Sequence, residues 1–232
     1  RRTADTGSMS GNASLERRLP IPQVMRTLAR AIDEHELPAV EKIANARQAF
    51  HVLIGTLLSA RTQDATTHAA SERLFRRAPT PARMAALRVT EIEQLIYPVS
   101  FYRNKARHVK ETCRRLLRDF GGRVPGTMEE LLTLPGVGRK TANLVLILAF
   151  HSPDNICVDT HVHRISNRLG WVRTKTPDET ERALYRVADR RHWPDINLYL
   201  VVWGQNVCRP ISPRCAACVI SRWCPRVGVR AG

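Results

Sequence analysis

Four cysteines near the end of the chain have a spacing that suits an inorganic centre. They follow the pattern C-x6-C-x2-C-x5-C and are Cys208, Cys215, Cys218 and Cys224. Structural zinc sites usually pair two Cys-x2-Cys knuckles or include histidine, and this pattern does neither. Disulfides are typical of small secreted domains, whereas this chain shows no secretory h-region and is long enough to build a core. A [4Fe-4S] cluster accepts four unevenly spaced thiolates from a compact loop, so we favour it over zinc and disulfides.

A glycine-containing turn in the middle of the chain is a candidate anion site. Gly136 and Gly138 flank Val137 in the segment Leu-Pro-Gly-Val-Gly-Arg-Lys, and a helix is expected to begin at Arg139. Two glycines allow a tight turn with exposed amides, and the positive end of the helix points the same way. The pattern predicts a phosphate cradle between two helices, with a plain helix connection as the alternative.

Lys140 and Asp159 are the candidates for covalent chemistry. Lys140 falls in the first turn of the helix after the cradle, where the helix dipole disfavours a cation and so favours the neutral, nucleophilic amine. Only an amine, not a guanidinium, can form a Schiff base. Asp159 precedes an amphipathic helix, and a carboxylate that caps this helix would stay ionised and could stabilise a cationic sugar. The alternatives are an exposed, phosphate-contacting Lys140 and an Asp159 that is only a cap.

Other reactive side chains are predicted to be structural. Cys113 and Cys157 stand alone in apolar surroundings and are expected to be small buried hydrophobes. His161 and His163 alternate and therefore do not share a helix face, so they do not indicate a metal site. We expect His163 to be structural.

The charge balance indicates a polyanion partner. The chain has 37 Lys and Arg against 21 Asp and Glu, a formal net charge of +16. The cysteine-containing loop carries Arg209, Arg214 and Arg222 and has no acidic residue. This excess predicts binding to nucleic acid, with the loop as part of the contact surface. No apolar run approaches membrane-spanning length, so we expect a soluble, cytoplasmic protein with no membrane partner.

The elements that must position these residues are predicted to be helices. Apolar positions recur with a period near 3.6 and strand alternation is almost absent, which indicates an all-α protein with short connections. Residues 1–19 lack this periodicity and are expected to be disordered or the remnant of a tag. Helix starts are indicated by Pro22, Pro177, Asp64 as a cap, and capping boxes at Thr90 and Glu93 and at Thr127 and Glu130. A buried helix is expected from Arg47 to Ser59, and Gly121-Gly122 indicates a helix end.

With these motifs in place, the chain resembles the endonuclease III family of DNA glycosylases, in the helix-hairpin-helix superfamily. The resemblance covers about residues 21–226 and keeps the hairpin with Lys140, the segment with Asp159 and the cysteine loop in the family's order. It implies a two-lobed fold. A six-helix barrel at 41–152 would contain the helix-hairpin-helix motif at 127–151, and 20–40 with 153–232 would form the iron-sulfur domain.

The resemblance also implies an activity. The family comprises bifunctional DNA glycosylase/AP lyases that remove oxidised pyrimidines, so Lys140 would attack the sugar C1′ and form a Schiff base while Asp159 stabilises the transition state. β-Elimination would then cut the strand 3′ of the site. The expected partner is double-stranded DNA containing oxidised pyrimidines or abasic sites. We expect a monomer, associated with the nucleoid of a bacterium.

The chain departs from the family pattern at the residue that would fill the gap left by a flipped nucleotide. Family members commonly have Gln after Leu-Ser-Ala, whereas here Arg61 follows and Gln63 comes two residues later. Arg can donate two hydrogen bonds to guanine, so we predict that Arg61 enters the duplex and favours lesions opposite guanine. Phe101 is predicted as an apolar wedge, with a core role as the alternative, and His161 is expected near the catalytic pocket.

Two other functions remain open at this stage. One is that of the adenine-type mismatch glycosylases, which share the cluster but lack the lysine at the Lys140 position. The other is a non-catalytic, redox-sensing DNA-binding protein in which the hairpin only holds phosphate.

Overall fold

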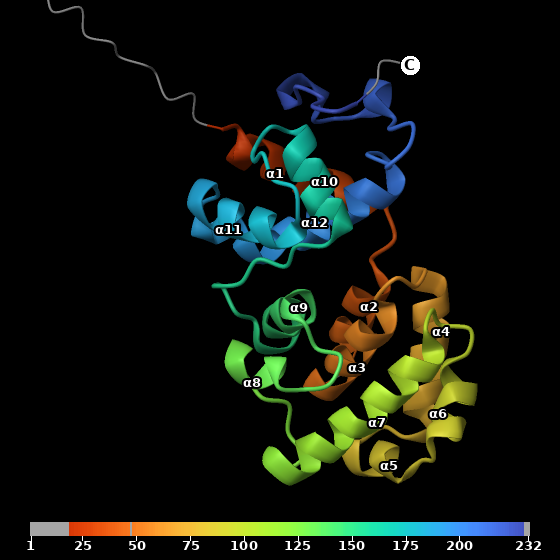
Figure 1. The fold of residues 1–232 in the computed structure, drawn as a ribbon. Helices are drawn as coiled ribbons and strands as arrows, with labels where there is room; N and C mark the ends of the chain where they lie inside the picture. Colours follow the sequence, from red (N-terminus) through yellow and green to blue (C-terminus); the bar gives the residue numbers. More distant parts are fainter. Residues whose placement is uncertain (1–18, 47, 230–232) are drawn as a thin grey trace, which may run out of the picture.

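Every regular element is helical within residues 19–46 and 48–229, the parts of the chain that the computed structural model describes (Figure 1). The predicted all-α fold class is therefore confirmed, and the prediction for residues 1–19 falls almost wholly outside the described residues. No described helix is long and apolar enough to cross a membrane. The α-helices are α1 Ile21–Ala31, α2 Ala39–Ala46, α3 Ala49–Ser59, α4 Asp64–Arg77, α5 Pro81–Ala86, α6 Val89–Ile96, α7 Tyr102–Asp119, α8 Met128–Leu132, α9 Arg139–Phe150, α10 Thr160–Arg168, α11 Pro177–Val187 and α12 Trp193–Asn206.

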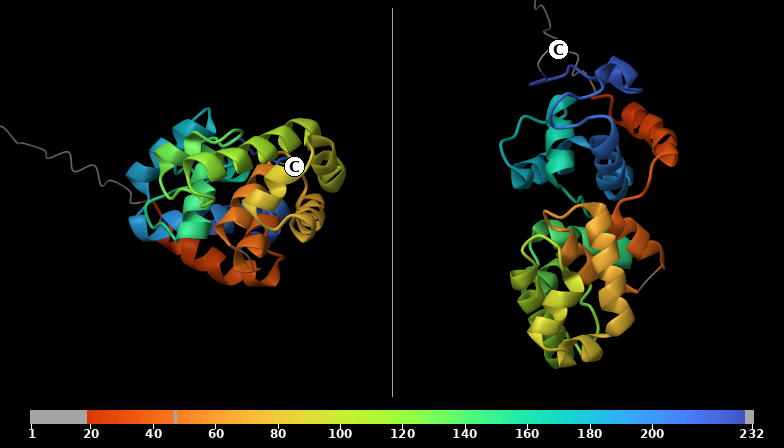
Figure 2. Two further views of the ribbon diagram at one scale, coloured as in Figure 1. Left: turned by 90° about the horizontal axis from the view of Figure 1, so that it is seen from below. Right: turned by 90° about the vertical axis from the view of Figure 1, so that its right-hand side faces the viewer.

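The helices form two lobes, each with its own core (Figures 1 and 2). The central lobe contains α2 to α9, and its core runs from Val40 to Cys157. The terminal lobe combines α1 with α10 to α12 and the loop 207–229, so it is built from both ends of the chain. This matches the two-lobed architecture expected from the sequence. The residue limits predicted for the domains stay a prediction, because buried cores do not define where a folding unit begins.

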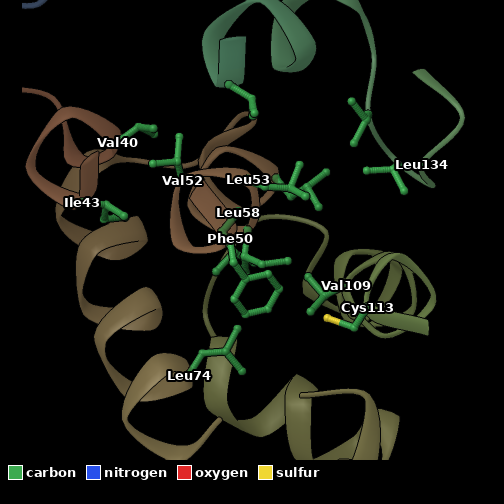
Figure 3. Close-up of a cluster of buried hydrophobic side chains, with 14 of the residues drawn as sticks. Val40, Ile43, Phe50, Val52, Leu53, Leu58, Leu74, Val109, Cys113 and Leu134 are labelled. Carbon is green, nitrogen blue, oxygen red and sulfur yellow. The ribbon is translucent and has the colours of Figure 1, made fainter. Parts of the chain in front are cut away.

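The central lobe is organised around α3, whose side chains from Phe50 to Leu58 are all buried. Figure 3 shows Phe50, Leu53 and Leu58 of this helix meeting Leu74 and Val109 from neighbouring elements. Leu53 is fully buried, so its truncation to alanine would cost about 2–5 kcal/mol. This tight packing also fixes α9, the helix that carries Lys140, against α3.

Helix starts agree with the sequence prediction where the capping side chain and the N–H groups it binds are close neighbours in the chain. Thr127 and Asp159 accept backbone N–H groups at the starts of α8 and α10, as predicted. Two other predictions were wrong. Asp64 does not cap α4 but is its first residue, and its carboxylate accepts a hydrogen bond from Gln205. The capping box expected at Thr90 and Glu93 lies two residues earlier, because Glu91 accepts from the Arg88 backbone N–H at 2.8 Å.

Candidate active site

A cleft of about 660 Å³ lies between the two lobes and contains the predicted chemistry. Both lobes line it, with α2, α3 and α9 on one side and the start of α10 and α12 on the other. Five of the predicted site residues are on its wall, namely Arg61, Gln63, Lys140, Asp159 and His161. Residues that are far apart in the sequence are therefore brought to one space that a nucleotide could enter.

Lys140 is the second residue of α9 and is partly buried. Its backbone carbonyl lies 3.5 Å from the thiol of Cys157, on the segment that joins the lobes. Burial raises the pKa of the Cys157 thiol to about 12, so this cysteine is neutral at physiological pH. Cys157 therefore acts as packing beneath the lysine, as the sequence predicted, and not as a competing nucleophile.

Asp159 is held as the N-cap of α10. Its Oδ1 accepts the backbone N–H groups of His161 at 2.8 Å and Val162 at 2.9 Å. Such a cap stabilises a helix by about 0.5–2 kcal/mol and fixes the carboxylate at the cleft. Among the described residues, Oδ2 has no hydrogen-bond partner, so one oxygen remains for a developing positive charge in the cleft.

His161 is fixed beside this carboxylate by the contact between α10 and α12. Desolvation lowers the pKa of His161, with Asp159 acting in the opposite direction. Arg164 Nη2 lies 3.1 Å from His161 Nδ1. A Cβ at Gly204 would come within 2.4 Å of that same Nδ1, so glycine is needed for the two helices to approach. The structure thus places His161 near the candidate catalytic pair, as expected.

The hairpin before α9 has the geometry of an open turn. Gly136 has a φ of +78°, and a Cβ there would come within 2.7 Å of His108 Nδ1. Val137 is buried, whereas a Cβ at Gly138 would meet nothing within 4 Å. The space beside Gly138 is open, and its phosphate role stays a prediction. Arg139 is partly committed elsewhere, because its Nη2 is 2.5 Å from the buried carboxylate of Glu181 across the lobes.

Two loop tips meet at the edge of the central lobe. Arg61 and Phe101 both have left-handed backbone, with φ of 55° and 57°. Phe101 is 59% exposed, and the Arg61 guanidinium carbon lies 5.9 Å from the centre of its ring. The core alternative for Phe101 is excluded by this exposure. Their predicted contacts in a DNA gap stay predictions, but the two side chains form one projecting pair.

A residue that the sequence analysis missed holds these loops together. Lys105 of α7 is buried, and its Nζ donates to the carbonyls of Leu58 at 2.7 Å and Ala60 at 2.6 Å and to Thr62 Oγ1 at 3.1 Å. Thr62 Oγ1 also accepts the Ser100 N–H at 3.3 Å, so the two loops are linked. Burial, with a smaller effect of Lys140, lowers the pKa of Lys105 to about 8.

The four C-terminal cysteines surround one cavity in the terminal lobe. Its wall contains Cys208, Cys215, Cys218 and Cys224 together with Trp203. All are free thiols, so the disulfide alternative is not found. In the described part of the chain, no three His, Cys, Asp or Glu side chains converge closely enough for a single ion. A cubane has separate iron corners and needs its thiolates spread around a hollow, which this arrangement provides.

Donors around the cavity suit a sulfur-rich group. The buried Trp203 indole lines the cavity and lies against the Cys218 thiol. Burial raises the pKa of the Cys218 thiol, and the Trp203 indole partly offsets this. Arg168 Nη1 donates to Cys208 Sγ at 3.4 Å and to the Arg209 carbonyl at 2.7 Å. An indole N–H beside these thiols is a donor that cluster sulfur could use.

The arginines of the cysteine loop are exposed. Arg209, Arg214 and Arg222 form no ion pair within the described residues, and Arg222 stacks over Trp223 at 3.9 Å. Their charges are therefore available to a polyanion, as the sequence predicted, although no contact with DNA is tested.

An all-helical fold of two lobes, with a lysine at the start of a hairpin helix and a carboxylate on the wall of the same cleft, defines a helix-hairpin-helix DNA glycosylase. Comparison with known proteins agrees. The model of the HhH-GPD superfamily of base excision DNA repair proteins matches residues 54–189. Endonuclease III of Thermotoga maritima is 48% identical over 175 residues, which are 75% of this chain and 82% of that protein.

Two further matches support the same assignment. The chloroplastic endonuclease III homolog 2 of Arabidopsis thaliana is 47% identical over 184 residues, which are 76% of this chain and 48% of that protein. The structure of a trapped endonuclease III-DNA covalent intermediate matches with a TM-score of 0.79 at 34% identity, covering 89% of this chain and 94% of the other. The chain belongs to the endonuclease III family. The predicted enzyme class, a bifunctional DNA glycosylase and AP lyase of base excision repair, is thereby confirmed.

Proposed function

We propose that this enzyme removes oxidised pyrimidines from duplex DNA, with Lys140 as the nucleophile and Asp159 as the stabilising carboxylate. The observation that carries the proposal is their shared cleft of about 660 Å³, which is lined by the partly buried Lys140 and by Asp159, the carboxylate that caps α10. A flipped nucleotide needs such a pocket, because the sugar C1′ is not accessible inside a base-paired stack.

The residues would act in sequence on the flipped nucleotide. Lys140 Nζ forms a bond to C1′ as the glycosidic C–N bond breaks, and the departing base keeps the electron pair and takes up a proton. Asp159 opposes the positive charge that develops on the sugar. Loss of the amine protons and opening of the sugar ring give an imine, which makes the C2′ proton acidic. Elimination then breaks the C3′–O bond on the 3′ side.

We propose that Cys208, Cys215, Cys218 and Cys224 hold a [4Fe-4S] cluster. The common cavity, the free thiols and the Trp203 indole N–H on the cavity wall support this assignment. When bound, such a group cross-links the loop and shields its thiolates. The exposed loop arginines Arg209, Arg214 and Arg222 would then grip the DNA backbone. No step of base removal is assigned to the cluster.

The proposed DNA contacts are spread over both lobes. Amides of the hairpin at Gly136 to Arg139 would hold a phosphate next to the lesion, while Arg61, Gln63 and Phe101 approach the gap in the duplex. We propose a monomer acting in the cytoplasm, because flipping a single nucleotide requires no two-fold symmetry. The net charge of +16 supports double-stranded DNA as the partner.

Borohydride trapping tests this proposal. Wild type and Lys140→Gln, at matched iron content, are incubated with a duplex that carries thymine glycol, and Lys110→Gln serves as a control on a lysine outside the cleft. We expect a covalent adduct and a 3′ nick from wild type and the control, and a loss of about 10³-fold or more in Lys140→Gln, because the nucleophile is gone.

The possible failures separate the alternatives. Base release by wild type without trapping would indicate a monofunctional glycosylase. Release of adenine opposite oxidised guanine, with none from thymine glycol, would support the adenine-type activity. DNA binding with no base release at all would support the non-catalytic interpretation.

A further inference from the structure

Glu41 is an unpaired carboxyl group on the wall of the active-site cleft. It belongs to α2 and is only partly exposed. Within the described residues it makes no hydrogen bond or ion pair, although the chain has 16 more basic than acidic side chains. Its neighbour Lys42 pairs instead with Glu36 at 3.0 Å. A carboxyl group left without a cation in so basic a protein is poised for something other than a structural ion pair.

Glu41 lies on the wall of the cleft that Lys140 and Asp159 also line. Helix α2 contacts α9, the helix that carries Lys140. The Glu41 carboxyl therefore belongs to the wall that a flipped sugar would meet.

The chemical environment of Glu41 differs from that of Asp159. Burial, with a smaller effect of Asp195 on α12, raises the pKa of Glu41 to about 7. Asp159 Oδ1, in contrast, accepts two backbone N–H groups at the start of α10. Glu41 is therefore suited to exchange a proton near neutral pH, whereas Asp159 Oδ1 is engaged by the start of α10.

The proposed lyase reaction requires such a group. Once Lys140 has become an imine nitrogen, it cannot also remove the C2′ proton, and Asp159 Oδ1 is already bound by two backbone N–H groups at the start of α10. A general base works best when it titrates close to the operating pH. Lys105 donates hydrogen bonds to three oxygen atoms. Below its pKa of about 8 it is protonated and cannot accept a further proton.

We propose that Glu41 is the general base that removes the C2′ proton during strand cleavage. This inference rests on the function proposed above. The Glu41 carboxylate takes the proton, and the C2′–H electron pair becomes the C1′=C2′ bond of an enamine. The enamine then forms the C2′=C3′ bond and expels the 3′ phosphate with the C3′–O electron pair. The proton leaves Glu41 to the departing phosphate or to water.

The other ionisable groups near Glu41 define what a pH experiment must control. Those on the cleft wall are Arg61, Asp64, Lys140, Asp159, His161 and Asp178. Asp195 acts on Glu41 from α12. Among these groups, Asp195 does not line the cleft. Its substitution should change the pKa of Glu41 while leaving the residues assigned to catalysis in place.

A preformed abasic-site duplex separates elimination from base removal. Under single-turnover conditions, imine formation is measured by borohydride trapping and elimination by nicking, for wild type, Glu41→Gln and the exposed control Glu36→Gln. We expect Glu41→Gln to be trapped like wild type but to nick about 10²-fold or more slowly, and to lose the rise in nicking rate near pH 7. Glu36→Gln should behave like wild type.

Asp195→Asn provides a second test that does not remove the carboxyl group. Loss of the neighbouring negative charge should lower the pKa of Glu41, so the rise in nicking rate should move to lower pH while trapping is unchanged. Nicking by Glu41→Gln at the wild-type rate across this range would overturn the proposal. Equal loss of trapping and nicking in a folded Glu41→Gln would also overturn it, since Glu41 would then act before elimination. Failure of wild type to be trapped would instead refute the Lys140 mechanism.

Discussion

Irregular segments in the two lobes are both expected to contact DNA, yet the chain holds them in different ways. In the central lobe, the loops that carry Arg61 and Phe101 are tied by Lys105 to three oxygen acceptors. In the terminal lobe, residues 207–229 contain only two short 3-10 turns and wrap around a cavity with four thiols. The first is fixed by hydrogen bonds from a buried lysine, whereas the second surrounds four thiols.

This difference indicates where each contact surface obtains its rigidity. A buried lysine is available as soon as the central lobe has packed, so Arg61 and Phe101 are preorganised without a cofactor. The terminal loop has Arg164 and Arg168 bonding to its carbonyls, but its centre depends on what the thiols bind. Removal of the proposed cluster should therefore weaken binding of the terminal loop to the DNA backbone before it disturbs the pocket for the lesion.

The largest expected effect comes from removing one thiol of the cavity. Cys218→Ala should lose bound iron and its visible absorption, and the loop from Cys208 to Cys224 should become a protease target. Cys113→Ala is the matched control, because Cys113 is fully buried in the central lobe. It should retain iron and lose about 1 kcal/mol of unfolding free energy. Iron analysis with limited proteolysis distinguishes them, and equal iron in both variants would remove the cluster assignment.

A smaller effect is expected from Lys105→Met, with Lys110→Met on the same helix as control. The two carbonyls that Lys105 bonds would lose a donor, at about 1–3 kcal/mol if no water replaces it, and amide exchange at the two loops should accelerate.

The pH dependence of this effect has a definite sign. The folded pKa of Lys105, about 8, lies below the model value of 10.5, so the unfolded chain binds more protons between these values. The unfolding free energy of wild type relative to Lys105→Met should thus rise as pH increases through that window and be flat below it. Urea unfolding on both sides of pH 8 measures this, and a difference that falls would contradict the assignment.

The smallest expected effect concerns Arg61. Arg61→Gln should leave thymine glycol excision largely intact but reduce the preference for guanine opposite the lesion by about 1 kcal/mol, or roughly fivefold, the low end of the range for a bidentate contact. The measurement is a set of single-turnover rates with each base opposite the lesion. Unchanged preference would show that the Arg61 and Phe101 pair supports the gap by shape alone.

Local chemistry explains what the sequence could predict. The caps at Thr127 and Asp159 depend on neighbours within a few residues, and both are confirmed. The cysteine pattern is also local, and its four residues line one cavity. Asp64 looked like a cap, but Gln205, 141 residues away, competes for its carboxylate.

Partners distant in the chain explain what the sequence could not predict. Lys105 finds its acceptors 43 to 47 residues away, and no pattern along α7 reveals that its ammonium is buried. Glu41 owes its raised pKa to packing and to Asp195, more than a hundred positions later. Both roles arise only when the lobes are assembled, so they follow from tertiary structure and not from motif spacing.

The composition of the terminal lobe from both ends of the chain has a consequence for synthesis on the ribosome. Helix α1 packs on α12, so the apolar face of Val24, Met25 and Leu28 has no partner until about 170 further residues have been made. The central lobe can fold during that interval, but α1 must wait with its apolar face in water. Nascent chains stalled before α12 should therefore recruit chaperones through α1, and release them once α12 emerges.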